Sequence, residues 1–432
     1  MKKAILTMAV LLCAATLFTQ KPILLPSCRR IPVPTKAQLE WQEMEMNMFC
    51  HFGPNTFSGV EWGSGQEADD LFNPTEMDCR QWAATAKAAG FKGIIITAKH
   101  HDGFCLWPNP ESTHTVAQSS WKNGQGDVLK ELSEACLEYG LKFGVYISPW
   151  DRNDPRYGTP DYNMAFARTL ENVHDGRYGD IFEQWFDGAC GEGPDGKRQE
   201  YDWTLFTGTV RRLHPLAIMF SDVGPDCRWV GNELGYAGET NWSTLSPEGF
   251  TPGAGSPPVD TLNSGNVHGT FWIPAEADVS IRPGWFWKES DTQKLKSVDE
   301  LMDIYFGSVG RNAVLLLNVP PDTRGRIPEA DSLRLMEFKA RRDDIFSKEA
   351  ADRFNIVCLR EEISRGQRVA EFAVDAFVEG EWTEIAHGTT IGYKRLLKVP
   401  TVNSNKVRVR VLRSYGKPHL GKTSLYYNSL EP

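Results

Sequence analysis

The sequence of 432 residues lacks the signatures of several common enzyme classes. It has no G-x-S-x-G, no P-loop leading from a strand into a helix and no G-x-G-x-x-G that opens a helix, which argues against lipase-type, nucleotide-binding and dinucleotide-binding proteins. It also lacks an excess of positive charge, because the 47 Lys and Arg are outnumbered by 56 Asp and Glu, the net charge is -9 and runs of Lys and Arg are short. We therefore expect no nucleic-acid partner.

Cysteine and histidine are present without the spacings of a metal centre. The nine cysteines contain no C-x-x-C, so we expect buried, reduced thiols rather than a zinc site or a disulfide framework. The nine histidines form no H-x-H or H-x-x-x-H. The adjacent His100 and His101 should point in opposite directions at a strand end, so one ion would not take both. We predict no metal and no cofactor, and imidazoles that bind a hydroxylated ligand.

The first residues have the pattern of a secretory signal. A charged start, MKK, is followed by an apolar run over residues 4–18, which is short for a membrane span. We expect a signal peptide over residues 1–20, export to the periplasm or the exterior, and no membrane span. Cys13 lies in an imperfect lipoprotein box, so a lipid anchor remains an alternative.

Between residues 36 and 345, apolar strand-like runs alternate with helical patterns, a rhythm typical of a parallel sheet or barrel. Strands are predicted at Met46–His51, Gly93–Ala98, Phe143–Ser148, Ile181–Asp187, Ala217–Ser221 and Ala313–Asn318. Helices are predicted at Met77–Ala89, Asp127–Tyr139, Tyr162–Val173, Tyr201–Leu213 and Val298–Gly307. We therefore predict an α/β fold with a (β/α)8-like barrel over residues 27–345.

Two other regions depart from this rhythm. After residue 353 the periodicity changes to two, in FNIVCL, VAEFAVDAFV, EWTEIA and KVRVRVL, which predicts a β-sandwich-like domain over residues 346–432. Residues 224–297 include a Gly/Pro-rich stretch, GNELGYAGETNWSTLSPEGFTPGAGSPP, for which we expect long loops over the barrel mouth.

Polar residues follow directly after the predicted barrel strands. His51, the run KHHD at residues 99–102, and Asp187 all take this position, and such strand ends converge on one rim of a barrel. We therefore expect a pocket there. Asp187, in QWFDGACGEG, is either a carboxylate held for chemistry or the start of an Asp-Gly turn, and the residues alone leave both open.

A pair of carboxyls can cleave a sugar if one attacks the anomeric carbon and the other protonates the leaving oxygen. Glu233, Glu239 and Glu276 are candidates for the second group, and tryptophans accompany each of them. Aromatic rings cover the apolar faces of sugars, so cofactor-free hydrolysis of a carbohydrate fits this pattern. The sequence does not select among the three glutamates.

A set of motifs, in order along the chain, resembles the α-L-fucosidases of glycoside hydrolase family 29. They are HFGPNTF with EW, TAKHHDGFCLWP, GVYISPWD, QWFDGACGEG, RWVGNELG, SIRPGWFW and LLLNVPPDTRGRIP, within about residues 41–328. GTTIGYKRLL in the C-terminal part is similar to the β-sandwich that follows the barrel in this family. The form R-W-x-G-N-E resembles the branch that acts on α-1,3 and α-1,4 fucosyl linkages.

The resemblance implies an exo-acting, retaining α-L-fucosidase that removes terminal fucose from oligosaccharides or glycoconjugates. It implies Asp187 as the nucleophile and Glu233 as the general acid/base. The residues that it implies for holding the fucose are His51, Glu61, Trp62, His100, His101, Tyr146 and Trp285, with Arg228 as a weaker assignment.

One departure and two rival functions remain. The segment between the barrel's last helix and FNIVCL is shorter than in the family, so we expect a shortened sandwich with an unpaired edge. A retaining glycosidase for another sugar such as galactose is one rival, because fold alone does not fix the substrate. A fucose-binding protein that has lost catalysis is the other.

Overall fold

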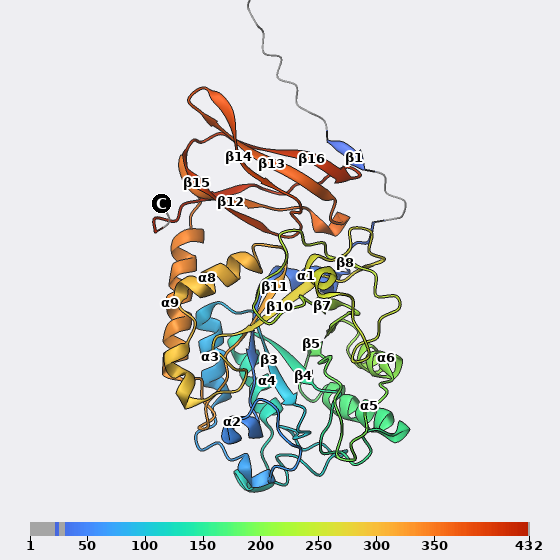
Figure 1. Cartoon of the computed structure of the whole chain (residues 1–432). Coiled ribbons are helices and arrows are strands. Elements are labelled where there is room, and N and C mark those ends of the chain that lie inside the picture. Colours follow the sequence, from blue (N-terminus) through green and yellow to red (C-terminus); the bar gives the residue numbers. More distant parts are fainter. Residues whose placement is uncertain (1–21, 26–30, 431–432) are drawn as a thin grey trace, which may run out of the picture.

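The computed structural model describes residues 22–25 and 31–430, and eight parallel strands close into a barrel in its larger part (Figure 1). The predicted signal peptide, with Cys13, lies outside the described residues. The predicted barrel is confirmed. In order around it, the strands are β10 (Ala275–Ser280), β11 (Val314–Asn318), β2 (Met46–Cys50), β3 (Gly93–Lys99), β4 (Lys142–Ile147), β5 (Ile181–Trp185), β6 (Ile218–Ser221) and β7 (Cys227–Trp229).

Helices surround the barrel and begin and end where the sequence supplies caps. Asp78 and Asp127 accept from backbone amides at the starts of two helices, and Gly90 and Gly140 end the same helices in the left-handed conformation. The helices are α1 (Lys36–Met44), α2 (Pro54–Ser58), α3 (Cys79–Ala89), α4 (Val128–Tyr139), α5 (Pro160–His174), α6 (Trp203–Leu213), α7 (Val259–Ser264), α8 (Val298–Gly307) and α9 (Glu329–Phe346). Short 3-10 turns lie at Asp69–Leu71, Trp121–Gly124, Glu289–Lys294 and Ile363–Arg365.

The expectation of long loops over residues 224–297 was wrong in part, because two barrel strands, β7 and β10, lie in this region. Strand β7 has only three residues. Strand β10 carries Glu276 and Asp278 in an otherwise small-residue run, and both are buried. Because charged residues occupy inward positions of β10, this strand has no apolar run by which the sequence could have indicated it. A short antiparallel pair, β8 (Thr244–Leu245) with β9 (Phe271–Trp272), lies between them.

Two sheets packed over an apolar cluster form the C-terminal domain (Figure 1). One contains β1 (Ile23–Leu25), β16 (Val407–Tyr415), β13 (Val369–Val378) and β14 (Glu381–Gly388). The other contains β15 (Arg395–Asn403), β12 (Arg353–Leu359) and β17 (Ser424–Tyr426). Strand β1 pairs in parallel with β16. Strand β1 thus covers the outer side of β16, and β14 forms the other edge of this sheet.

The segment GKPHLGKT, residues 416–423, has the letter spacing of a P-loop but not its structure. It connects β16 to β17, which are both strands. A P-loop leads into a helix, where backbone amides receive the phosphates. The segment therefore gives no reason to expect a nucleotide site.

Glu45, at the end of α1, links the barrel to the sandwich. Its carboxylate forms an ion pair with Lys394 and accepts hydrogen bonds from the hydroxyls of Tyr393 (3.1 Å) and Tyr305 (3.3 Å), with Arg360 nearby at 3.5 Å. Burial raises the pKa of Glu45, but the charge and hydrogen bond of Lys394, with smaller contributions from Arg360 and Tyr393, outweigh it and leave the pKa below its usual value. The carboxylate is thus ionised and stabilises the contact between the two domains.

We expect Glu45→Gln to lower the free energy of unfolding at pH 7 by about 1–3 kcal/mol, because it leaves the buried ammonium of Lys394 without its counter-charge. The Glu45 side chain is 21% exposed, which keeps the loss below that of a fully buried pair. Denaturant unfolding measures the change. Glu337→Gln, which removes a 60% exposed partner of Arg334, is the control and should cost less than about 1 kcal/mol. Equal losses for the two variants would contradict the role of Glu45.

Candidate active site

Side chains that point into the barrel lie in layers, because successive residues of a strand face opposite sides. Glu183, Trp185 and Asp187 follow this alternation along β5 and just beyond it, with Asp187 at the mouth. The register pairs Trp185 with Phe220 of β6. The next inward positions on the two strands are Asp187 and Asp222, which face the same cavity.

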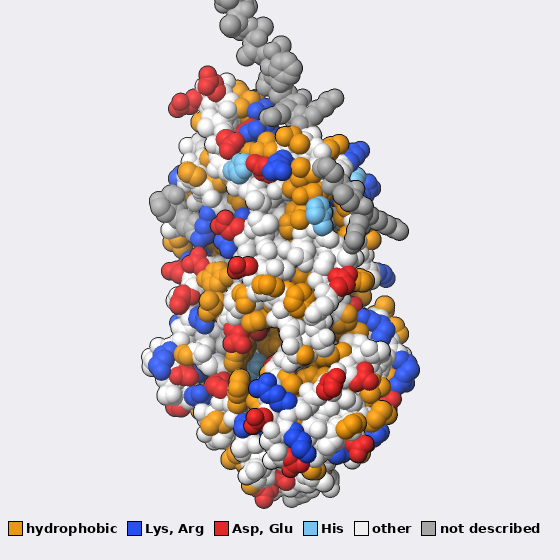
Figure 2. Space-filling model, turned by 45° about the vertical axis from the view of Figure 1, so that its right-hand side comes forward, with side chains coloured by type: hydrophobic (Ala, Val, Ile, Leu, Met, Phe, Trp, Pro, Cys, Tyr) orange, Lys and Arg blue, Asp and Glu red, His pale blue; other side chains and the backbone are white. Residues whose placement is uncertain are grey.

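This cavity of about 250 Å³ lies at the carboxyl ends of the strands and contains both predicted catalytic carboxyls. Figure 2 shows a hollow on the barrel, with hydrophobic side chains around it and the pale blue of histidine inside. The stacked rings of Trp185 and Phe220, 4.0 Å apart, form part of the wall deep in the barrel. The residues that line the cavity are Trp185, Asp187, Gly188, Ala189, Phe220, Asp222, Trp229, Glu233 and Asp278.

Both oxygens of Asp187 have fixed partners. The Tyr146 hydroxyl donates to Oδ2 at 2.9 Å, and the backbone amide of Ala189 donates to Oδ1 at 2.7 Å. His101 Nε2 lies 3.8 Å from Oδ2. The amide contact is the Asp-Gly turn that the sequence left open, so the turn and the site use the same carboxylate.

Glu233 alone of the three candidate glutamates shares the cavity with Asp187. Glu276 is buried inside the barrel, and Glu239 is exposed and pairs with Arg311 at 3.5 Å. Trp285 Nε1 donates to Glu233 at 3.3 Å. Glu233 is exposed at the mouth, and partial desolvation there raises its pKa, opposed by the Trp285 hydrogen bond and helped by the charge of Asp187. The result is a carboxyl that keeps its proton to higher pH than usual.

The predicted histidines are buried and neutral at neutral pH. Burial lowers the pKa of His51 to about 3 and that of His101 to about 4, and it places the pKa of His100 well below its usual value. His51 Nδ1 lies 2.8 Å from Asn318 Oδ1, so it is the donor and Nε2 is left to accept. Neutral imidazoles with one free nitrogen suit hydroxyl groups.

Loops after β2 and β10 bring the other predicted residues to the rim. Glu61 accepts from the backbone amide of Trp285 at 2.9 Å and pairs with Lys288 at 2.8 Å. The ring of Trp285 lies 5.0 Å from that of His51. Trp62 is 60% exposed and meets the ring of His101 edge-on at 5.8 Å. These residues form a polar and aromatic rim around the mouth.

Comparison with known proteins decides the family. The family model described as alpha-L-fucosidase matches residues 32–340. Alpha-L-fucosidase 1 of Arabidopsis thaliana is 38% identical over 453 residues, covering 92% of this chain and 88% of the plant protein. The chain belongs to the α-L-fucosidase family. It is therefore a glycoside hydrolase.

Solved structures of the same family share the fold of this chain. A glycoside hydrolase 29 family member from an unknown rumen bacterium is 40% identical with a TM-score of 0.87, covering 93% of this chain and 79% of that one. A Ruminococcus gnavus glycoside hydrolase 29 fucosidase in complex with fucose is 30% identical with a TM-score of 0.84, covering 95% and 98%.

The structure does not bring Arg228 to the site, contrary to the expectation from the family resemblance. Cys227 and Trp229 point into the barrel, so Arg228 between them points outward. Its guanidinium is fully buried and donates to the carbonyl of Leu262 at 2.8 Å and to Asn241 Oδ1 at 2.9 Å. Arg228 fixes loops behind β7 and does not line the cavity.

The expectation that His100 and His101 diverge was also wrong, because their ring centroids lie 4.1 Å apart. Strand β3 ends at Lys99, and strand alternation no longer applies to the turn that follows. The described residues nevertheless contain no group of three or more metal-ligating side chains that could hold an ion. The seven cysteines in this part of the chain are unpaired, and all but Cys190 are buried.

Sequence reasoning missed Asp222 and Asp278, which also line the cavity. Asp222 follows a predicted strand, so the same rule that found Asp187 would have found it. Asp278 lies inside the unrecognised β10, where it accepts from Trp229 Nε1 at 2.9 Å. Burial raises the pKa of both carboxyls, to about 6 for Asp222 and well above the usual value for Asp278.

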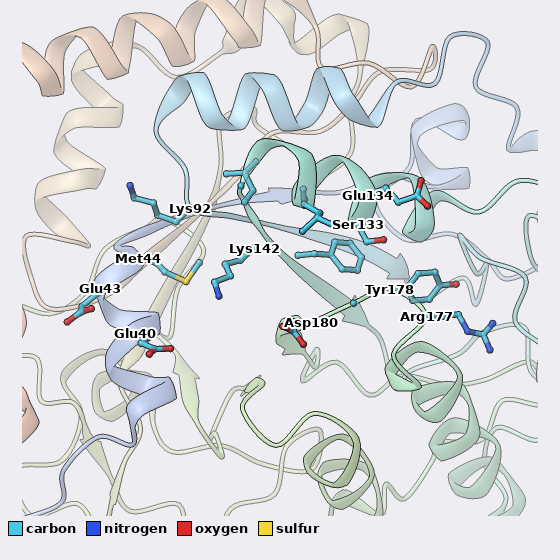
Figure 3. Close-up of a pocket in the computed structure, with 16 residues that line it drawn as sticks. Glu40, Glu43, Met44, Lys92, Ser133, Glu134, Lys142, Arg177, Tyr178 and Asp180 are labelled. Atoms are coloured by element: carbon cyan, nitrogen blue, oxygen red, sulfur yellow. The ribbon is translucent and has the colours of Figure 1, made fainter.

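A larger cavity of about 680 Å³ lies at the opposite end of the barrel (Figure 3). Lys142 begins β4, and Lys92 and Asp180 directly precede β3 and β5, so this cavity is at the amino ends of the strands. Barrel enzymes place their chemistry at the carboxyl ends. The volume of this cavity therefore does not make it the active site.

Two carboxyls share the barrel interior below the site. Glu183 accepts from Trp41 Nε1 at 2.8 Å, and Glu276 accepts from Trp185 Nε1 at 3.0 Å. Among the described residues, Oε1 of each carboxyl is buried without a hydrogen-bond partner. Burial raises the pKa of both, and mutual repulsion raises that of Glu276 further.

We expect this pair to make the protein less stable as pH rises. The folded-state pKa values lie above those of the unfolded chain, so the stabilisation is complete below the usual carboxyl pKa and is lost as pH rises through the raised values. Glu183→Gln, which keeps a neutral acceptor for Trp41 and removes a charge beside Glu276, should raise the melting temperature relative to wild type at pH 9 more than at pH 5. Exposed Glu40→Gln is the control. Parallel curves for wild type and Glu183→Gln would refute the assignment.

Proposed function

We propose that the chain is an exo-acting α-L-fucosidase that cleaves with retention of configuration, with Asp187 as nucleophile and Glu233 as general acid/base. The observation that carries this proposal is the shared cavity of Asp187 and Glu233. A retaining mechanism needs one ionised and one protonated carboxyl on either side of the glycosidic bond. Two hydrogen-bond donors hold Asp187, and partial desolvation raises the pKa of Glu233, as those roles require.

The first half-reaction displaces the leaving sugar. Asp187 attacks the anomeric carbon and forms a fucosyl ester, while Glu233 donates its proton to the departing oxygen. The Tyr146 hydroxyl orients the attacking carboxylate, since it donates to Oδ2. In the second half-reaction Glu233, now ionised, takes a proton from water, which opens the ester and restores both carboxyls.

The surroundings of the two carboxyls support a terminal sugar as the substrate. Trp185 and Phe220 limit the depth of the cavity, so a chain cannot pass through it. His51, His100 and His101 are neutral and suit hydroxyl groups, and Glu61, Trp62 and Trp285 add a carboxylate and two rings. The substrates are fucosylated oligosaccharides or glycoconjugates.

The linkage and the location of the enzyme extend this proposal. The R-W-x-G-N-E motif, which includes Glu233, resembles that of the branch acting on α-1,3 and α-1,4 linkages, and this resemblance favours those linkages here. The N-terminal pattern favours export to the periplasm or the exterior. No helix among residues 22–25 and 31–430 is both long and apolar enough to cross a membrane.

A single experiment tests substrate and stereochemistry together. The protein is incubated with α-1,2, α-1,3 and α-1,4 fucosylated oligosaccharides, and proton NMR follows the anomer of fucose that appears first. We expect α-fucose from the α-1,3 and α-1,4 substrates. Early β-fucose would exclude double displacement, release of galactose from galactosides would support the rival glycosidase, and tight binding without turnover would support the inactive binding protein.

Asp187→Ala should fold normally and lower kcat for an aryl α-L-fucoside by at least about 10⁴-fold, because it removes the carboxylate that forms the ester. Near wild-type activity would refute the nucleophile.

Glu233→Gln should slow oligosaccharide cleavage by about 10²–10⁴-fold, since the leaving sugar needs a proton. The loss in the first half-reaction should be smaller for an aryl fucoside with an acidic phenol, which leaves without protonation. The control is Glu239→Gln, a glutamate six residues away that pairs with Arg311 outside the cavity, and its rates should match wild type. Steady-state rates on both substrates measure these losses. An equally small loss for Glu233→Gln and Glu239→Gln would contradict the role of Glu233.

A further inference from the structure

Asp222 differs from the other acids that line the cavity in how its oxygens are satisfied. Asp187 accepts from Tyr146 and Ala189, and Glu233 and Asp278 each accept from an indole. Among the described residues, the buried Oδ1 of Asp222 has no hydrogen-bond partner, and the nearby amide of Val223 donates to Ser221 Oγ at 3.3 Å. A buried carboxyl oxygen without a donor is costly, so this position is prepared for a donor that arrives with a ligand.

The space beside Asp222 is kept open by Gly188, the residue after the proposed nucleophile. A Cβ built on Gly188 would lie 3.0 Å from Asp222 Oδ2, closer than nearly all real contacts of this kind. A side chain there would require the Asp222 carboxyl to shift by a few tenths of an ångström. Gly188 therefore leaves room for the carboxyl of Asp222, which follows the neighbouring strand, and it also belongs to the turn at Asp187.

The order of strands around the barrel indicates which sugar Asp222 meets. The groups proposed to hold fucose occupy the arc of the barrel from β10 to β4: Trp285 follows β10, the other groups follow β2 and β3, and Tyr146 lies on β4. Asp187 follows β5, Asp222 follows β6, and Glu233 comes four residues after the end of β7. Since Glu233 must reach the leaving oxygen, the β6–β7 side of the nucleophile is the side of the leaving sugar.

We propose that Asp222 is a specificity-determining residue that accepts a hydrogen bond from a hydroxyl of the sugar to which the fucose is attached. This inference rests on the proposed fucosidase function and deepens it. The ligand class is a hexose or N-acetylhexosamine unit at the leaving position. An aryl leaving group without hydroxyls would form no hydrogen bond with Asp222.

The test compares two substrates that share fucose and differ in the leaving group. We measure kcat/KM for an α-1,3 or α-1,4 fucosylated oligosaccharide and for an aryl α-L-fucoside with wild type, Asp222→Ala and Asp222→Asn. Asp222→Ala should lower kcat/KM for the oligosaccharide by about 10- to 100-fold, the range for a lost hydrogen bond to a charged group, and change that for the aryl fucoside by less than about threefold. Asp222→Asn, which retains an accepting oxygen, should lose less.

A second measurement detects the same contact without turnover of the oligosaccharide. The defucosylated oligosaccharide should inhibit hydrolysis of the aryl fucoside by wild type, and Asp222→Ala should weaken this inhibition by a similar factor. Asp180→Asn is the matched control, because this aspartate lies at the opposite end of the barrel, directly before β5. It should leave both substrates and the inhibition unchanged. Melting temperatures of all variants show whether each is folded.

The possible outcomes are distinct. Equal losses of kcat/KM on both substrates would place Asp222 on the fucose or in the fold, and would overturn the inference. Unchanged rates and unchanged inhibition in Asp222→Ala would overturn it as well. If wild type released no fucose from either substrate, the proposed function itself would fail, and this result cannot be mistaken for a failure of Asp222 alone.

Discussion

Alternation of side chains along the strands of a closed barrel is the constraint on which this structure depends. Closure fixes the register of each strand against its neighbours, so a residue's inward or outward direction follows from its position alone. On β5 this rule sets Glu183, Trp185 and Asp187 at increasing height. The site lies at the mouth of the barrel, in the uppermost layer of inward-facing side chains, which is polar.

The layer below the site explains why the barrel interior contains acids. Trp185 and Phe220 provide a rigid apolar wall, but an indole has an N–H that needs an acceptor once it is buried. Glu276 accepts from Trp185, and Asp278 does the same for Trp229. Each acid is more stable protonated here, because burial penalises its charge. The acids thus fix the orientation of the aromatic wall of the cavity.

The sequence predicts elements whose local pattern agrees with the tertiary structure. Strand β3, GIIITAK, has β-branched residues on both faces and was placed within one residue. Strand β10 was missed because Glu276 and Asp278 occupy its inward positions, and their burial depends on partners distant in the chain. Asp187 could be predicted from its strand, whereas the choice of Glu233 over Glu239 needed the path of a loop that no local rule specifies. Arg228 was expected at the site from the family resemblance alone, but it alternates with Cys227 and Trp229 on β7 and therefore points out of the barrel.

The proposed general acid lies on a loop, and contacts across the barrel mouth compensate for the flexibility that a loop would allow. Glu61, after β2, accepts from the backbone of Trp285, and the indole of Trp285 donates to Glu233. Lys288 holds Glu61 from the other side. If Glu61 also binds a hydroxyl of fucose, occupation of that position and placement of the acid are coupled through one tryptophan. An enzyme built in this way would assemble its acid/base geometry best when the correct sugar is bound, which ties substrate recognition to catalysis.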